Sequence, residues 1–179
     1  MTRLIILDRD GVINHDSDEY IKSPDEWRPL PGSLQAIANL HRAGYKLVVA
    51  TNQSGLGRGL FNLDTLRDIH EKMLRQIRDE GGALDGIFYC PHIPNDHCRC
   101  RKPETGLFED IAQRFQASLA EVYAVGDNLR DTQAALAVGA KPIHVLTGKG
   151  ASVIEARSLP ANVPVFDDLA CFARYLIAA

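Results

Sequence analysis

The sequence has no strong excess of either charge and no long apolar run. Its 20 Lys and Arg residues nearly balance its 23 Asp and Glu residues, which gives a formal net charge of −3. A nearly neutral chain offers no general attraction to nucleic acid or to an anionic membrane, so we expect neither as a partner. No run approaches the roughly 18 apolar residues of a membrane span. Any anionic ligand is therefore expected to bind to a local cluster of cations.

Targeting and linker segments are also missing. The N-terminal segment MTRLIILDRD has neither the long apolar region nor the small-residue cleavage site of a signal peptide, and we expect a cytoplasmic protein. There is no internal repeat, no low-complexity tract and no linker rich in Pro, Gly or Ser. We expect the 179 residues, 1–179, to form a single domain and a monomer.

Short apolar runs alternate with segments of helical periodicity along the chain. The runs predict strands at 4–7, 46–50, 86–89, 122–125 and 143–146, and the periodic segments predict helices at 34–43, 64–78, 107–115 and 132–138. This alternation is typical of an α/β fold with a Rossmann-like parallel sheet and helices on both faces.

Two carboxylates follow the first predicted strand directly, in the segment Asp8-Arg9-Asp10-Gly11. They are expected at the carboxyl end of a parallel strand, where open α/β sheets bind their ligands. An acidic turn without function is one alternative. A calcium loop of the Asp-x-Asp type is another, although the apolar residues at 12–13 do not continue the ligand alternation of an EF-hand.

Three further polar sites lie at predicted strand ends or helix starts. They are Thr51-Asn52, Lys102-Pro103 and the segment from Gly126 to Asp131, GDNLRD. Each has a structural interpretation when taken alone: a turn, a solvated charge and a helix cap. Together and in this order, the four sites resemble the motifs of the haloacid dehalogenase superfamily of phosphotransferases.

The resemblance implies a catalytic role for four of these residues. Asp8 would be the nucleophile that attacks phosphorus and forms an acyl phosphate. Asp10 would be the general acid and base, which protonates the leaving alcohol and then activates water. The Thr51 hydroxyl and Lys102 would neutralise the oxygens of the transferring group.

The resemblance also implies a Mg²⁺ site and a fold without a cap domain. The ion would be held by Asp8, the backbone carbonyl of Asp10 and Asp127, with Asp131 in support. The intervals between the motifs are too short for the large cap domain found in many members of the superfamily. We therefore expect the loops at 15–31 and 53–62 to enclose the substrate.

Three of the four cysteines lie within eleven residues, next to a histidine. Cys90, His92, Cys98 and Cys100 suit tetrahedral Zn²⁺, in a closed structural site that stabilises the loop and holds residues 99–102 beside the phosphate. A reduced thiol cluster is the alternative, and His97 competes with His92, which matches the family position. The other histidines are expected on the surface or on helix faces: His15, His41, His70 and His144.

The combination of DRDGVIN, TNQSG, the cysteine loop, CRKP and GD is similar to the histidinol-phosphatase-like family within the superfamily. It implies a Mg²⁺-dependent phosphatase that removes the 7-phosphate of a heptose bisphosphate on the route to lipopolysaccharide core. The expected substrate contacts are Asp16, Tyr20, Thr51, Asn52, Gln53, Ser54, Arg58, Arg101 and Lys102. Arg58 and Arg99 have a second interpretation as solvated charges. A histidinol-phosphate phosphatase and a non-catalytic, zinc-stabilised binding module remain alternatives.

Overall fold

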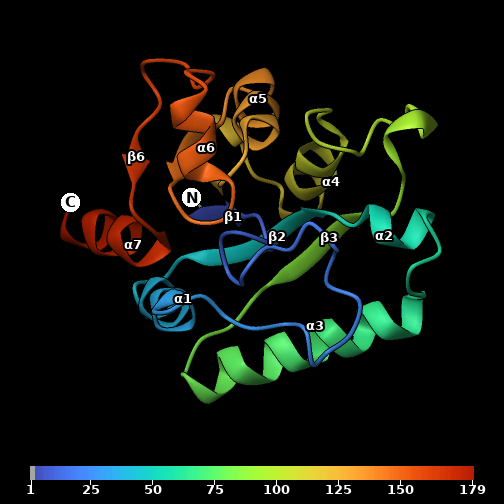
Figure 1. The fold of residues 1–179 in the computed structure, drawn as a ribbon. Coiled ribbons are helices and arrows are strands. Elements are labelled where there is room, and N and C mark those ends of the chain that lie inside the picture. The colour runs from blue at the N-terminus through green and yellow to red at the C-terminus, as the bar shows by residue number, and fades with distance from the viewer. Residues whose placement is uncertain (1–2) are drawn as a thin grey trace.

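The computed structural model describes residues 3–179, and its strands form a six-stranded, entirely parallel sheet (Figure 1). The strands are β1 (Leu4–Leu7), β2 (Lys46–Asn52), β3 (Gly86–Cys90), β4 (Tyr123–Gly126), β5 (Lys141–Val145) and β6 (Val165–Phe166). Their order in the sheet is β3-β2-β1-β4-β5-β6. This is the order of a doubly wound sheet, and the predicted Rossmann-like fold is confirmed.

Helices cover both faces of the sheet. They are α1 (Ser33–Arg42), α2 (Ser54–Gly57), α3 (Leu63–Asp79), α4 (Gly106–Phe115), α5 (Leu129–Ala137), α6 (Gly150–Glu155) and α7 (Leu169–Ala178), with short 3₁₀ turns at Pro94–Asp96 and Leu119–Glu121. α1, α3 and α7 pack on one face, and α4 and α5 pack on the other (Figure 1). The molecule therefore has two apolar cores, one on each side of the sheet.

The first strand shows why these residues form a central strand. Ile5 and Leu7 point into the core under α1, α3 and α7, whereas Leu4 and Ile6 point into the core under α4 and α5. All four are at most 2% exposed. A strand buried on both faces needs a continuous apolar run, so the first polar residue after it, Asp8, marks the carboxyl edge of the sheet.

No element was predicted beyond residue 146, where α6, β6 and α7 lie, and the short α2 was not predicted either. In α7, apolar side chains occur on more than one face, which weakens the helical periodicity. The helix is nevertheless well packed, because Phe172 lies edge-on to Tyr123 and Phe166, with ring centres 5.6 and 5.5 Å apart. Asp168 caps it by accepting a hydrogen bond from the Cys171 amide.

The intervals between the predicted motifs hold only single helices and loops. Between β1 and β2 the chain forms α1, and between β2 and β3 it forms α2 and α3. Within residues 3–179 there is no cap domain, as predicted. No helix in this part of the chain is both long and apolar enough to cross a bilayer.

Candidate active site

Strand pairing brings the ends of β1, β2 and β4 together. Leu7 of β1 is in register with Val49 of β2 on one side and with Val125 of β4 on the other. The Asp8 amide continues the ladder by donating to the Val125 carbonyl at 2.9 Å. Side chains just beyond these strands therefore meet at the switch point of the sheet, where doubly wound folds bind ligands.

Three buried carboxylates meet at this edge, and we call them the carboxylate cluster: Asp8, Asp127 and Asp131. One oxygen from each lies within 4.8 Å of the others, and the residues are 2–6% exposed. Burial raises the pKa of Asp8 to about 6 against the opposing effect of Lys102. Burial and the charges of Asp8 and Asp131 raise the pKa of Asp127 to about 8. An all-oxygen set with surplus negative charge fits Mg²⁺.

The backbone closes tightly around Asp127. A Cβ atom added at Gly11, which has a φ of +82°, would lie 2.1 Å from Asp127 Oδ2. Only glycine permits both this conformation and this approach. The turn after β1 therefore shapes the carboxylate cluster as well as supplying Asp8.

Lys102 lies beneath the carboxylate cluster and is 2% exposed. Its ammonium nitrogen is 3.1 Å from Asp8 and 2.7 Å from Asp131, and it donates to the Ala50 carbonyl. Burial lowers the pKa of Lys102, but the two carboxylates outweigh this effect and raise it above its ordinary value. Asn52 holds the Lys102 backbone through a reciprocal pair of 3.0 Å hydrogen bonds.

Asp10 has a different environment from Asp8, although the two are separated by one residue. One Asp10 oxygen accepts from Arg9 Nε and Asn14 Nδ2, both at 2.9 Å. The other accepts from Arg9 Nη2 at 3.0 Å and from Gln53 Nε2 at 2.9 Å. Burial alone would raise the pKa of Asp10, but Arg9 and the other donors hold it below its ordinary value.

A cavity of about 460 Å³ opens above these groups. The predicted magnesium and substrate residues that line it are Asp8, Asp10, Asp16, Tyr20, Thr51, Asn52, Gln53, Ser54, Arg58, Arg101 and Asp127. Lys102 is absent from the lining because it is buried against Asp8 and Asp131. Both predicted enclosing loops contribute, and they meet where the Arg58 guanidinium lies 5.8 Å from the centre of the Tyr20 ring.

A third wall of the cavity, at residues 149–158, was missed by the sequence analysis. The Lys149 amide donates to Asp127 Oδ2 at 2.7 Å, and its ammonium pairs with Asp18 and lies 3.9 Å from Asp16. This segment follows β5. The rule that strand ends bind ligands could have indicated it.

Three guanidinium groups, which we call the arginine cluster, line the same cavity: Arg58, Arg101 and Arg130. Within residues 3–179 none of them has a carboxylate oxygen within 4.0 Å. Burial, with the neighbouring charges of Arg130 and Arg58, lowers the pKa of Arg101. The buried Arg130 Nε has no partner in this part of the chain. Three cations without counter-charges favour binding of an anion.

Arg130 was missed because nothing in its local sequence separates it from a solvated helix residue. Asn128 stands two positions earlier and caps α5, since its side chain accepts from the Arg130 amide. The cap fixes the first turn of the helix at the cavity rim. Asn128 also lines the cavity, but the positive charge at this rim belongs to Arg130.

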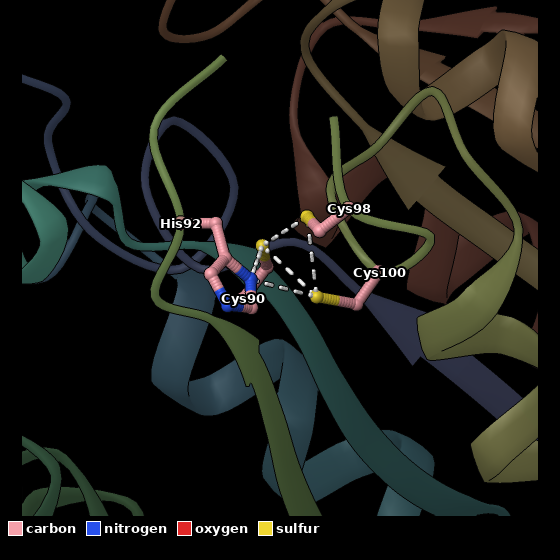
Figure 2. Close-up of side chains that lie close together, drawn as sticks. All are labelled: Cys90, His92, Cys98 and Cys100. Atoms are coloured by element: carbon pink, nitrogen blue, oxygen red, sulfur yellow. Dashed lines mark hydrogen bonds between the residues drawn. The ribbon is translucent and has the colours of Figure 1, made fainter. Parts of the chain in front are cut away.

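A second cluster lies at the end of β3 and in the loop that follows, where Cys90, His92, Cys98 and Cys100 converge (Figure 2). We call it the thiol–imidazole cluster. Its close atom pairs are 3.2–3.6 Å apart. A Zn²⁺ tetrahedron with bonds of about 2.0–2.3 Å has edges of about 3.4–3.8 Å, so a slight outward movement accommodates the ion. His97 is exposed and lies outside the cluster.

Two predictions about nearby side chains need correction. Arg99 does not line the cavity; it is 68% exposed and pairs with Glu109 and Asp110 at 3.0 and 2.6 Å. His144 is buried in strand β5 at 0% exposure, and so lies neither on the surface nor on a helix, whereas His70 lies on a helix face as expected, on the buried side of α3 at 8% exposure. Burial requires polar partners, and His144 finds one in the Gly150 carbonyl while His70 finds one in Arg9.

Comparison with known proteins identifies the class. Residues 2–139 match the model of the haloacid dehalogenase-like hydrolases, and the chain belongs to this family. It is 55% identical over 175 residues, 98% of each chain, to the D-glycero-beta-D-manno-heptose-1,7-bisphosphate 7-phosphatase of Bordetella bronchiseptica. It is 51% identical over 177 residues to the enzyme of the same name from Neisseria meningitidis serogroup A, covering 98% of this chain and 95% of that protein.

Solved structures agree. The D,D-heptose 1,7-bisphosphate phosphatase from B. bronchiseptica, in complex with magnesium and phosphate, is 54% identical and superimposes with a TM-score of 0.96 over 99% of both chains. The corresponding phosphatase from Burkholderia thailandensis is 46% identical, with a TM-score of 0.80 over 99% of this chain and 100% of that one. The predicted fold, family resemblance and enzyme class, a phosphoric monoester hydrolase, are confirmed.

Proposed function

We propose that the chain hydrolyses the 7-phosphate of D-glycero-beta-D-manno-heptose 1,7-bisphosphate, with Mg²⁺ bound, on the route to lipopolysaccharide core. One observation carries the proposal: a single cavity is lined both by Asp8 and Asp127 of the carboxylate cluster, with Lys102 buried against Asp8, and by the arginine cluster, which has no carboxylate partner. In this proposal the carboxylate cluster and Lys102 act on the phosphate that is transferred, and the arginine cluster binds the other one. The names of the relatives support the same substrate.

Asp8 is the nucleophile in this proposal. Its carboxylate oxygen attacks phosphorus, a P–O bond forms, and the bond from phosphorus to the sugar oxygen breaks. Lys102, 3.1 Å from Asp8, opposes the effect of burial and favours the ionised form that the attack requires. Lys102 and Thr51 then stabilise the charge on the transferring group.

Asp10 acts as the general acid and base. It gives a proton to the departing sugar oxygen, and it later accepts a proton from the water that attacks the phosphorylated Asp8. This second attack breaks the bond from phosphorus to Asp8 and releases phosphate. The four hydrogen bonds to Asp10 fix the position of both of its oxygens at the cavity, where proton transfer to and from the substrate would take place.

Two metal ions complete the proposal. Mg²⁺ would be held by Asp8, the Asp10 backbone carbonyl and Asp127, where its charge would offset the repulsion between the carboxylates and the phosphate. Zn²⁺ would be held by the thiol–imidazole cluster, with no open position and hence with a structural role. The buried, mutually repelling carboxylates and the converging set of three thiols and one imidazole support these assignments.

The remaining substrate contacts follow from the cavity lining. The arginine cluster would bind the phosphate that is not transferred, because guanidinium groups bind phosphate oxygens in pairs. The sugar hydroxyls would contact Asp16, Tyr20, Asn52, Gln53 and Ser54 at the other walls.

We propose one domain, a monomer and a cytoplasmic location. The unpaired thiols favour a reducing compartment. Light scattering of the purified protein tests whether it is a monomer.

A phosphate-release screen with Mg²⁺ tests the function. We expect kcat/KM for the heptose bisphosphate to exceed that for simple sugar monophosphates and for histidinol phosphate. A preference for histidinol phosphate would overturn the substrate assignment and leave the phosphatase intact. Release from none of these compounds would favour a non-catalytic binding module.

A further inference from the structure

A buried side chain on α3 has no role in the proposed chemistry. His70 is 8% exposed, and its Nε2 lies 3.2 Å from Nη1 of Arg9. Arg9 itself is fully buried and stands between the proposed nucleophile and the proposed acid–base. The contact joins α3 to the end of β1 across 61 positions of the sequence.

The direction of this hydrogen bond follows from chemistry. A guanidinium group can only donate, so His70 Nε2 must accept and cannot carry the proton. Burial, with the charge of Arg9, lowers the pKa of His70 to about 3, which keeps the ring neutral. His70 is therefore a fixed acceptor for Arg9 under ordinary conditions.

The other donors of Arg9 are directed at the acid–base and its neighbour. Nε donates to Oδ1 of Asp10 and Nη2 donates to Oδ2, and Nη2 also donates to Gln53 Oε1 at 3.1 Å. A guanidinium is planar and rigid, so an acceptor at Nη1 fixes the orientation of the whole fork. The guanidinium group that donates to both oxygens of Asp10 is thus itself held by a residue that does not touch Asp10.

We propose that His70 is a positioning residue, which holds Asp10 in its catalytic orientation through the guanidinium of Arg9. The inference rests on the proposed acid–base role of Asp10. Without His70, a buried Nη1 donor has no acceptor, and the fork can turn away from Asp10 to find one. Proton transfer then suffers, while the groups that bind the substrate stay in place.

Two variants and a matched control test this role on the full chain with Mg²⁺. His70→Leu removes the acceptor, and His70→Gln offers an amide oxygen near the position of Nε2. Ile77→Val, in the same buried face of α3, weakens packing without touching Arg9. With the heptose bisphosphate we expect kcat to fall about 10- to 100-fold in His70→Leu, with KM changed less than about twofold. His70→Gln should recover most of kcat.

A double-mutant cycle separates positioning from general loss of structure. If His70 acts only through Asp10, adding His70→Leu to Asp10→Asn should cost less than about twofold more in kcat. A full additional loss, a kcat loss of the same size in Ile77→Val, or normal kcat in His70→Leu would each overturn the inference. If Asp10→Asn alone has normal activity, the acid–base assignment fails, and the inference fails with it.

Discussion

The carboxylate cluster and the thiol–imidazole cluster are both candidate metal sites, but they are built in opposite ways. Asp8, Asp127 and Asp131 come from distant parts of the chain and meet because β1 pairs with β4. The four residues of the thiol–imidazole cluster lie within eleven positions of one another, at the end of β3 and in its loop. One site depends on the whole fold, and the other organises a single loop.

The two clusters also differ in what surrounds them. The carboxylate cluster opens into a cavity with room for a ligand. Beside it lie Lys102 and Asp10, and the pKa of Asp10 is lowered while that of Asp8 is raised. The thiol–imidazole cluster supplies three thiols and one imidazole and leaves no position for a substrate. We therefore expect the carboxylate cluster to determine the rate of the reaction, and the thiol–imidazole cluster to determine the stability of the loop that holds Arg101.

The largest expected effect comes from Asp8→Asn. The amide has nearly the same shape but cannot form the acyl phosphate, so we expect kcat to fall by about 10⁴-fold or more. Thermal stability of the metal-free protein should not fall, because burial disfavours the Asp8 charge that the variant removes. Steady-state kinetics and thermal denaturation measure the two quantities. Near-normal turnover would refute the covalent mechanism.

Cys98→Ser should have the opposite effect to Asp8→Asn: it should lower thermal stability before it alters the chemical step. Loss of a thiolate opens the closed site, and we expect a loss of about 3 kcal/mol or more, roughly 6–12 °C in Tm. The purified protein should contain one zinc per chain, and the variant less. Brief treatment with EDTA followed by Mg²⁺ should restore full activity, since Mg²⁺ exchanges while zinc stays. Zinc-free protein with normal Tm would show that the cluster is only a group of reduced thiols.

Site residues in short local motifs could be predicted from the sequence, whereas those brought in by packing could not. Asp8, Asp10 and the cysteine loop are short motifs beside a strand, so local pattern was enough to find them. Arg130, Lys149 and His70 reach the site only through packing of α5, the loop after β5 and α3. The local pattern of Arg130 resembles that of an ordinary solvated helix position.

His70 did leave a signal in the sequence. It falls four positions after Leu66 and three before Met73, which places it on the buried face of the helix. A histidine on such a face needs a polar partner. The identity of that partner depends on how α3 packs against the end of β1, which the periodicity does not contain.

Arg101 connects the two clusters, because it follows Cys100 directly and lines the cavity. If it binds the remote phosphate, Arg101→Ala should lower kcat/KM for the bisphosphate about 10- to 100-fold and have little effect on a monophosphate. Lys102→Ala should harm both substrates alike, since both share the transferring group. Equal losses for the two substrates in Arg101→Ala would place Arg101 at the reaction centre.

A smaller effect is expected from pH on the metal-free protein. The pKa of Asp127 is raised from an ordinary value of 3.8 to about 8 in the folded protein. Between about pH 4 and 8 the unfolded chain therefore binds fewer protons than the fold, and the free energy of unfolding contributed by Asp127 falls as pH rises. The slope is at most about 1.4 kcal/mol per pH unit, or roughly 3–5 °C.

Asp127→Asn isolates this contribution. The difference in Tm, variant minus wild type, should be larger at pH 7.5 than at pH 5 when Mg²⁺ is absent. Excess Mg²⁺ should stabilise the wild type more at the higher pH, because the ion binds deprotonated carboxylates. A Tm difference that does not change with pH would mean that Asp127 is ionised in the metal-free fold.

The smallest effect is expected from Arg99→Ala, the matched control for Arg101. Both arginines flank the last cysteine of the loop, but Arg99 points away from the cavity toward Glu109 and Asp110. An exposed ion pair of this kind contributes about 1 kcal/mol at most, and salt screens it. We therefore expect Tm to fall by no more than roughly 4 °C and kcat/KM for the bisphosphate to stay within about twofold of wild type. A selective loss for the bisphosphate would show that Arg99 turns toward the substrate, and the loop would then present two arginines to the remote phosphate.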